Sequence, residues 1–139
     1  MDISIGPAIN LWKFNSETPS LPNPEKLISA VNLVDYRNIF IEGSSISLKK
    51  TGMSLNLGAI GKGYAIDKAV DTLKFYGIKS GIVNAGGDLM AFGSKKGTKP
   101  WLVGLQHPRK PEEMIATLAL IDKAIATSGD YQRYFIHNE

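Results

Sequence analysis

The chain has no cysteine and only two histidines among its 139 residues. Without cysteine it forms no disulfide, offers no thiol nucleophile and holds no cysteine-bound zinc. His107 and His137 are too few for a zinc site unless other ligands join them. No apolar run reaches the roughly 18 residues that a membrane-spanning helix needs, and the first residues lack the pattern of a signal peptide. The sequence therefore predicts no thiol chemistry and no signal or membrane anchor in this chain.

Composition and charge narrow the class of protein further. Apolar side chains make up 43% of the chain and charged ones 21%, which is typical of one globular domain with a buried core. Sixteen Lys and Arg against thirteen Asp and Glu give a net charge of +3, but the lysines are scattered rather than gathered in one basic stripe. This excess mildly favours anionic ligands, and we expect no nucleic-acid partner.

Periodicity and turn residues predict an α+β fold, with mixed sheet layers packed around one long helix. Helices are expected over 7–12, 24–33 and 60–76, with a proline-rich loop over 16–24. Asn23 reads as the N-cap of the second helix and Gly77 as the C-cap of the third. Strands are expected over 37–42, 45–50, 53–57, 80–85, 89–92, 101–106, 115–121 and 124–126, with a further strand-like run over 131–139.

A glycine-rich segment, residues 56–67, leads into the long helix and is the most informative motif. Its glycines let the backbone approach a ligand closely, the free N–H groups of a helix start attract an anion, and Lys62 adds a positive charge. The spacing differs from that of a P-loop, which has a hydroxyl residue after the lysine, and from the dinucleotide-binding order of glycines. Two interpretations stay open: a phosphate site, or a tight turn whose glycines serve packing and whose lysine is solvated.

Two other polar turns offer groups for chemistry. Residues 84–88, Asn-Ala-Gly-Gly-Asp, form either an anion-binding turn or an ordinary hairpin turn. Residues 127–131, Thr-Ser-Gly-Asp-Tyr, could hold a ribityl chain or a phosphate, or form a capped turn. A serine hydrolase is disfavoured because no G-x-S-x-G elbow is present, and Ser128 and Asp130 stand too close in sequence to flank a histidine.

Taken in order, these motifs resemble the FAD:protein FMN transferase family, the ApbE type, formerly described as thiamine-biosynthesis lipoproteins. The family's segment F-D-I-T-V-G-P-L-x-x-L-W is matched by Asp2 to Trp12, and D-L-G-x-I-A-K-G-Y-A-x-D by Asn56 to Asp67. Its N-x-G-G-[DN] turn, its P-W-x-V-G-[IL]-Q-x-P run and its T-S-G-D-Y-x-R-Y-F segment are matched by 84–88, 100–108 and 127–135. The resemblance implies that residues 1–139 are the central part of a single ApbE-like domain of T-fold-related architecture.

The resemblance also implies an activity. Members of this family split FAD, attach FMN to a threonine hydroxyl of a target protein, release AMP and use magnesium, so we expect FAD and a threonine-bearing redox subunit as partners. Lys62 would contact FAD, and the Ala59 backbone carbonyl would be a magnesium ligand. The other residues expected to line the flavin nucleotide are Asp2, Ile3, Ser4, Asn56, Thr127, Ser128, Asp130 and Tyr131. Family members usually work outside the cytoplasm, often membrane-anchored, and the same is expected of the full-length protein.

Two departures from the family pattern stand out. Asn56 occupies a position where the family commonly has aspartate, which keeps the hydrogen-bonding shape but removes a charge. The family's later segments, which supply the remaining magnesium ligands, do not follow Glu139, and the family's preceding segment is missing before Asp2. The chain is therefore expected to be incomplete at both ends and to have little activity alone. The alternatives are a non-catalytic FAD-binding module and a structural domain whose glycines serve packing.

Overall fold

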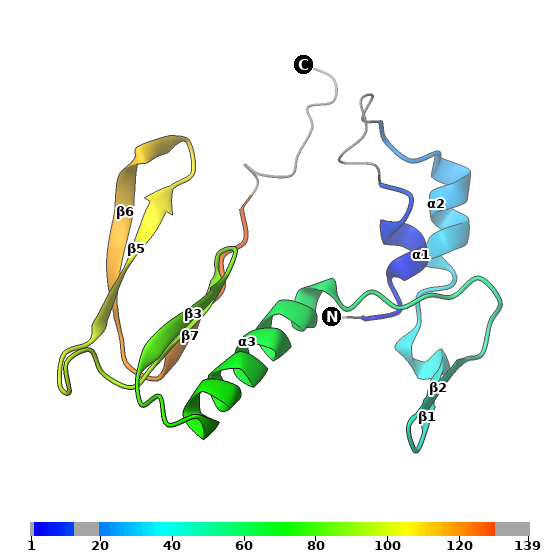
Figure 1. The fold of residues 1–139 in the computed structure, drawn as a ribbon. Coiled ribbons are helices and arrows are strands. Elements are labelled where there is room, and N and C mark those ends of the chain that lie inside the picture. Colours follow the sequence, from blue (N-terminus) through cyan, green and yellow to red (C-terminus); the bar gives the residue numbers. More distant parts are fainter. Residues whose placement is uncertain (1, 13–19, 130–139) are drawn as a thin grey trace. The chain divides into compact units, whose positions relative to one another are not determined.

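The computed structural model describes residues 2–12 and 20–129 (Figure 1). They form two compact units, one up to Leu57 and one from Gly58 onward. The first unit contains α1 (Gly6–Ile9), α2 (Pro24–Val31), the 3-10 helix η1 (Tyr36–Asn38), β1 (Ile39–Glu42) and β2 (Ser45–Leu48). The second contains α3 (Gly58–Phe75), β3 (Gly81–Ala85), β4 (Asp88–Phe92), β5 (Trp101–His107), β6 (Lys110–Leu120) and β7 (Lys123–Ile125).

Local signals determine most elements of the first unit. The Asn23 side chain accepts a hydrogen bond from the Lys26 amide at 3.0 Å, and Pro24 occupies the first helical position, so α2 begins where the sequence predicts. The expected hairpin is confirmed as β1 and β2, which pair antiparallel across a Gly43-containing turn. The first helix is shorter than predicted, because α1 ends at Ile9 instead of continuing to residue 12.

The prediction of a strand over residues 53–57 is wrong. This segment makes a single parallel bridge, between Ser54 and Ile5, and the Asn56 amide donates to the Ile3 carbonyl at 2.8 Å. Gly6 lies directly against Ser54, where a Cβ would come within 3 Å of both backbone and side-chain atoms. The segment therefore packs on the N-terminal turn, and a turn offers no extended row of partners from which a strand ladder can grow.

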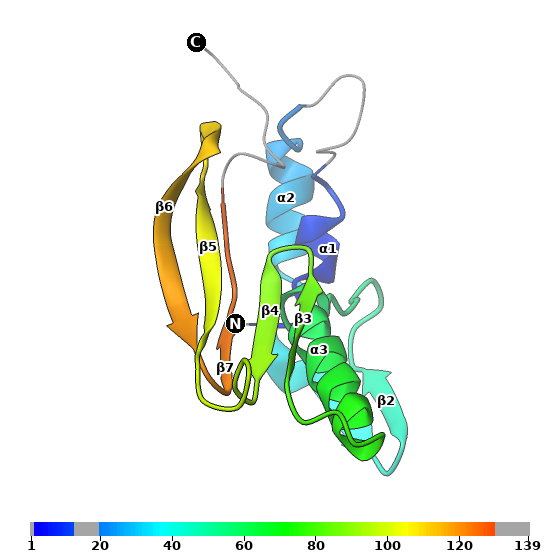
Figure 2. The same ribbon diagram turned by 60° about the vertical axis from the view of Figure 1, so that its left-hand side comes forward.

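The second unit is built in three layers (Figure 2). The middle layer is the antiparallel sheet β3-β4-β7, and the β5–β6 hairpin forms a sheet of its own. Alternation along β4 sends neighbouring side chains to opposite faces. Phe92 packs with Ile66 and Val70 of α3, whereas Leu89 and Ala91 pack with Leu120 of β6. Helix, sheet and hairpin are thus held by two small cores on the two faces of one strand.

Among the described residues, the predicted helix and strands of this unit are largely confirmed, and the strand-like run predicted over 131–139 lies outside them. The long helix begins at Gly58 and ends at Phe75, close to the expected 60–76. The clearest difference is β6, which begins at Lys110 instead of residue 115 and so includes Pro111. The register of the β5–β6 pair shifts on both sides of Gln106, and this irregularity accommodates a proline that a regular ladder would disfavour. The α+β class is confirmed, with small sheets.

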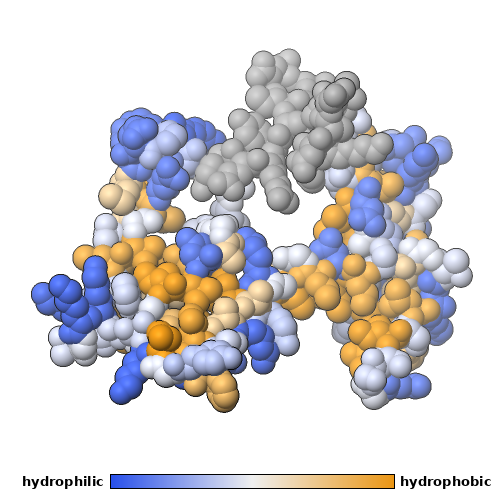
Figure 3. All heavy atoms as spheres, in the orientation of Figure 1, coloured by the Kyte–Doolittle hydropathy of each residue, from blue (hydrophilic) through white to orange (hydrophobic). Residues whose placement is uncertain are grey.

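Both units leave large apolar side chains on their surfaces (Figure 3). Within α3 only the central apolar side chains are covered: Ile66 and Val70 are buried, whereas Ile60 and Tyr64 are exposed. The sheet that α3 rests on spans five residues per strand in β3 and β4, so a helix of 18 residues extends beyond it. The N-terminal end of α3 carries the glycines and the lysine of the motif.

Candidate functional site

The first turns of α3 contain the glycine-rich motif, with Gly58, Gly61 and Gly63 all inside the helix. The helix starts two residues earlier than the sequence suggests, so these glycines do not form a separate turn before it. The first amides of a helix have no intrahelical partner and carry the positive end of the helix dipole, so they attract anions. A Cβ built on Gly61 or Gly63 meets no described atom within 4 Å. Packing among the described residues therefore does not require glycine at either position.

Helical spacing identifies the face on which these residues lie. Ala59, Lys62, Gly63, Ile66 and Val70 follow one another at intervals of three or four residues, which places them along one stripe of the helix. Ile66 and Val70 are buried against the sheet. The same stripe therefore continues past the apolar contact to Lys62 and Gly63.

Lys62 forms an ion pair with Asp88, the first residue of β4. The distance from Lys62 Nζ to Asp88 Oδ2 is 3.1 Å, and the lysine side chain remains 50% exposed whereas that of Asp88 is 21% exposed. The pair joins the N-terminal part of α3 to the turn between β3 and β4. An ammonium group has three donors, so a lysine with this exposure retains donors for a ligand.

The second glycine turn is a two-residue hairpin turn between β3 and β4. Gly86 and Gly87 both have positive φ, at 65° and 97°, a conformation that glycine adopts without strain. The Gly87 amide donates to Asn84 Oδ1 at 3.2 Å, and the Thr127 hydroxyl donates to the Gly87 carbonyl at 3.0 Å. The turn is thus held from both sides.

These contacts define a glycine-turn cluster, made of Lys62, Asn84, Gly87, Asp88 and Thr127. The cluster lies wholly within the second unit and brings together residues of three motifs that are far apart in the sequence. Ser128 is exposed beside it in the sequence, and Asp130 and Tyr131 lie outside the described residues. The pairing of Lys62 with Asp88 was missed, because no local signal links residues 26 positions apart.

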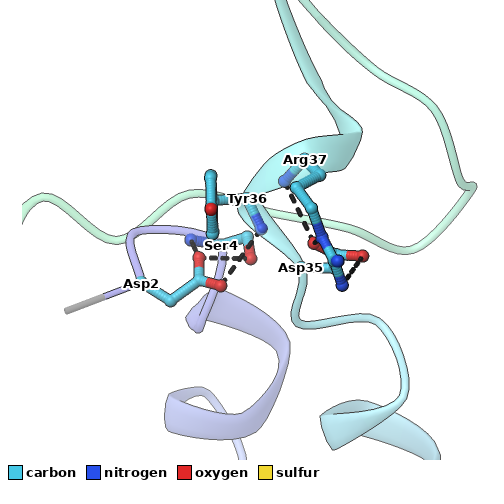
Figure 4. A network of polar contacts seen from close by, with 5 residues as sticks. All are labelled: Asp2, Ser4, Asp35, Tyr36 and Arg37. Atoms are coloured by element: carbon cyan, nitrogen blue, oxygen red, sulfur yellow. Dashed lines mark hydrogen bonds and ion pairs between the residues drawn. The ribbon is translucent and has the colours of Figure 1, made fainter.

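The predicted N-terminal residues form a polar network in the first unit (Figure 4). Asp2 Oδ1 accepts hydrogen bonds from the Ser4 amide at 2.9 Å and the Ser4 hydroxyl at 2.7 Å, and Asp2 Oδ2 accepts from the Tyr36 amide at 3.0 Å. The hydrogen bond from the Ser4 hydroxyl is the largest cause that lowers the pKa of Asp2, followed by the bond from the Ser4 amide. Ser4 is fully buried, and Ile3 and Asn56 are half-buried.

A second carboxylate lies next to this network. The Asp35 carboxylate accepts three hydrogen bonds from Arg37: from its backbone amide at 3.0 Å, from Nε at 2.8 Å and from Nη2 at 3.2 Å. The Arg37 side chain, hydrogen-bonded to the carboxylate, lowers the pKa of Asp35, and the same contact raises the pKa of Arg37. Asp2 and Asp35 therefore remain ionised to lower pH than isolated carboxyl groups, and both hold backbone around η1 in place.

The residues described do not make a magnesium site by themselves. No group of three or more histidine, aspartate or glutamate side chains that could hold a metal occurs within 2–12 and 20–129. Ala59 lies in the first turn of α3, where a helical carbonyl accepts one intrahelical bond and keeps a second lone pair. One carbonyl oxygen falls short of the six oxygen ligands of an octahedral magnesium ion. In the same described part, no helix is long and apolar enough to span a membrane.

Comparison with known proteins gives consistent matches along the whole chain. The model of the ApbE family matches residues 1–139. An FAD:protein FMN transferase of Vibrio cholerae is 30% identical over 138 residues, covering 97% of this chain and 41% of the relative. The crystal structure of the ApbE protein from Thermotoga maritima aligns with a TM-score of 0.86 and 34% identity, over 99% of this chain and 45% of that one.

A second solved structure agrees with the first. The apo form of the flavinyl transferase ApbE from Pseudomonas stutzeri aligns with a TM-score of 0.79 and 29% identity, covering 99% of this chain and 44% of that one. The chain thus spans less than half the length of the relatives that it matches. The expected resemblance is confirmed in both sequence and fold.

Proposed function

The chain belongs to the ApbE family, and from this premise we propose that it forms the nucleotide-binding part of an FAD:protein FMN transferase. The observation that carries the proposal is the glycine-turn cluster: a half-exposed lysine at the N-terminal end of a helix, beside a two-glycine turn. Helix amides, a lysine ammonium and glycines with free space around them are what a pyrophosphate requires.

The proposed reaction transfers the FMN part of FAD to a protein hydroxyl. The oxygen of an acceptor threonine forms a bond to the flavin-side phosphorus, the bond from that phosphorus to the bridging oxygen breaks, and AMP leaves with the bridging oxygen. The hydroxyl proton is released. Because positioning and neutralisation of charge supply most of the catalysis in phosphoryl transfer, a lysine held at the pyrophosphate would contribute directly.

The proposal gives each predicted residue a role. Lys62 would contact the FAD pyrophosphate, and Thr127 and Ser128 would bind near the same phosphates; the family resemblance assigns Asp130 and Tyr131, which lie outside the described residues, to the same site. Asp2, Ile3, Ser4 and Asn56 are assigned to the flavin nucleotide on the family resemblance. The network described above already occupies the Asp2 carboxylate with three bonds from the protein, so its role toward a ligand would be to hold the backbone of residues 2–4.

Three further parts of the proposal rest on resemblance alone. Magnesium would be required, with the Ala59 carbonyl as one ligand and the others supplied outside the described residues. The acceptor would be a threonine-bearing redox subunit. The full-length protein would work outside the cytoplasm. The magnesium requirement is tested by removing divalent metal with a chelator: activity should be lost, and added magnesium should restore it.

Flavin binding by the full polypeptide that contains this chain tests the role of Lys62. The variant Lys62→Gln keeps most of the side-chain volume and removes the charge. Loss of one hydrogen bond to a charged group costs about 1.5–3 kcal/mol, which corresponds to an increase of roughly ten- to 150-fold in the dissociation constant for FAD. Lys68→Gln is the matched control, because Lys68 is on the same helix and is similarly exposed but pairs with Asp71. Equal affinities in the two variants would contradict the proposed site.

A non-catalytic FAD-binding module is the second candidate. It would use the same glycine-turn cluster to bind FAD, without transfer of FMN. This candidate predicts FAD binding that is insensitive to magnesium and releases no AMP. The transferase predicts AMP release and a flavin-carrying acceptor.

A further inference from the structure

Asp88 is the one acidic residue in the glycine-turn cluster, and its presence at a proposed phosphate site needs a reason. A carboxylate repels a phosphate, so a site built only for anion affinity would avoid one. Asp88 nevertheless lies 3.1 Å from the lysine that is proposed to bind the pyrophosphate, and it is the less exposed partner of the pair.

The position of Asp88 is determined by its surroundings. It is the first residue of β4 and pairs with Ala85 of β3. The preceding residue, Gly87, is fixed through its amide by Asn84 and through its carbonyl by Thr127. Lys62, by contrast, has a long side chain that is half exposed, and such a side chain loses rotamer entropy when it is ordered. The aspartate is therefore the fixed partner, and the lysine is the one whose position the pair determines.

The ion pair is not needed to attach the helix to the sheet. Ile66, Val70 and Phe92 already make that contact through a buried core, and partly exposed ion pairs contribute little to stability. An ion pair with one fixed partner has a different effect: it selects one rotamer of the lysine before any ligand arrives. Lowering the entropy lost on binding is the general benefit of such preorganisation.

We propose that Asp88 is a positioning residue for Lys62. Its carboxylate takes one donor of the ammonium and holds the other two toward the Gly86–Gly87 turn, where a phosphate would meet them together with the N-terminal amides of α3. The inference rests on the proposed function, because it assigns Lys62 to the FAD pyrophosphate. The opposite role, in which Asp88 competes with the phosphate for Lys62, predicts an effect of the opposite sign.

A double-mutant cycle in the full polypeptide tests the inference, with the FAD dissociation constant measured by quenching of flavin fluorescence at low salt. The variants are Asp88→Asn, Lys62→Gln and both together. Asp88→Asn is expected to weaken FAD binding about two- to fivefold, the range for ion pairs of this exposure. In the Lys62→Gln background the same change should cause no weakening, because no ammonium remains to be positioned. Asp88→Glu keeps the charge and should recover at least half of the loss.

The outcomes separate the inference from the proposed function. If Lys62→Gln weakens FAD binding but Asp88→Asn leaves it unchanged or tightens it, Asp88 does not position the lysine and the inference fails alone. If Asp88→Asn weakens binding equally with and without Lys62, the aspartate acts independently and the inference also fails. If Lys62→Gln leaves FAD affinity unchanged, both the inference and the proposed function are contradicted. If Asp88→Asn does not fold, Asp88→Glu decides the same question, tested alone and together with Lys62→Gln. The shifted carboxylate should change FAD affinity only while Lys62 is present.

Discussion

Gly63→Ala is expected to make the protein more stable and a poorer binder of FAD. Glycine inside a helix costs about 0.5–1 kcal/mol relative to alanine. A Cβ at Gly63 meets no described atom within 4 Å, so no clash offsets this gain. The free energy of unfolding should therefore rise by about 0.5–1 kcal/mol, which raises the melting temperature by a few degrees Celsius.

Affinity should change in the other direction. Gly63 lies on the same stripe of α3 as Lys62 and Ile66, the stripe that faces the sheet and its β3–β4 turn. A methyl group added to a close-packed ligand surface costs about 1–3 kcal/mol, so the FAD dissociation constant should increase roughly five- to 150-fold. Fluorescence titration with FAD and thermal unfolding on the same samples give both quantities.

Gly61→Ala is the matched control. Gly61 is in the same helix and has equally free space, but two helical positions separate it from Gly63, which places it about 200° around the axis. The family pattern carries alanine at this position. Gly61→Ala should therefore gain the same stability and keep wild-type affinity. Equal affinities in the two variants would refute the assignment of the Gly63 face to the ligand, and a loss of stability in Gly63→Ala would show that protein atoms fill that space.

Two further predictions concern the polar contacts. Gly87→Ala should lower the free energy of unfolding by about 1–2 kcal/mol, because φ is +97° and the new Cβ would come within 2.7 Å of Thr127 Oγ1. Thermal unfolding measures this loss of stability, and an unchanged midpoint would contradict the described turn. Since folding lowers the pKa of Asp2, its stabilising effect is present above the unfolded pKa, about 4, and is lost as pH falls through the lower folded value. Asp2→Asn should therefore flatten part of the loss of stability below about pH 4, with the similar contribution of Asp35 remaining. Identical melting profiles of variant and wild type between pH 2 and 7 would contradict the Asp2 network.

The elements that the sequence predicts well are those with local signals. The N-cap at Asn23 and the proline after it mark the start of α2, and the period of 3.6 residues identifies α3. The Gly86–Gly87 pair marks a two-residue hairpin turn. In each case the residues that determine the structure lie within a few positions of one another, so no knowledge of the tertiary fold is required.

The predictions that the structure contradicts have a common physical cause. Residues 53–57 have the composition of a strand, but a strand needs a partner, and the segment lies against the N-terminal turn with one bridge to Ile5. The extension of β6 across Pro111 depends on a register irregularity opposite Gln106. Both are tertiary effects, which a local pattern does not contain.

For the candidate site too, the sequence predicts the local features but not the long-range contacts. Its motifs are visible in the sequence because glycine turns and a lysine at a helix start have recognisable spacing. The contacts that turn motifs into a cluster are long-range: Lys62 meets Asp88, and Thr127 meets Gly87. Likewise, the sequence singles out Asp2, but nothing in it predicts the bond that its carboxylate accepts from the Tyr36 amide, 34 residues away.

Transfer of FMN to an acceptor tests the central claim most directly. The full polypeptide containing this chain would be incubated with FAD, magnesium and a threonine-bearing acceptor protein, and the acceptor would be analysed by intact mass spectrometry while AMP is quantified. The account predicts one FMN per modified acceptor, an equal amount of AMP, and a rate that falls in Lys62→Gln but not in Lys68→Gln. FAD bound to the protein with neither AMP nor a flavin-carrying acceptor would contradict it.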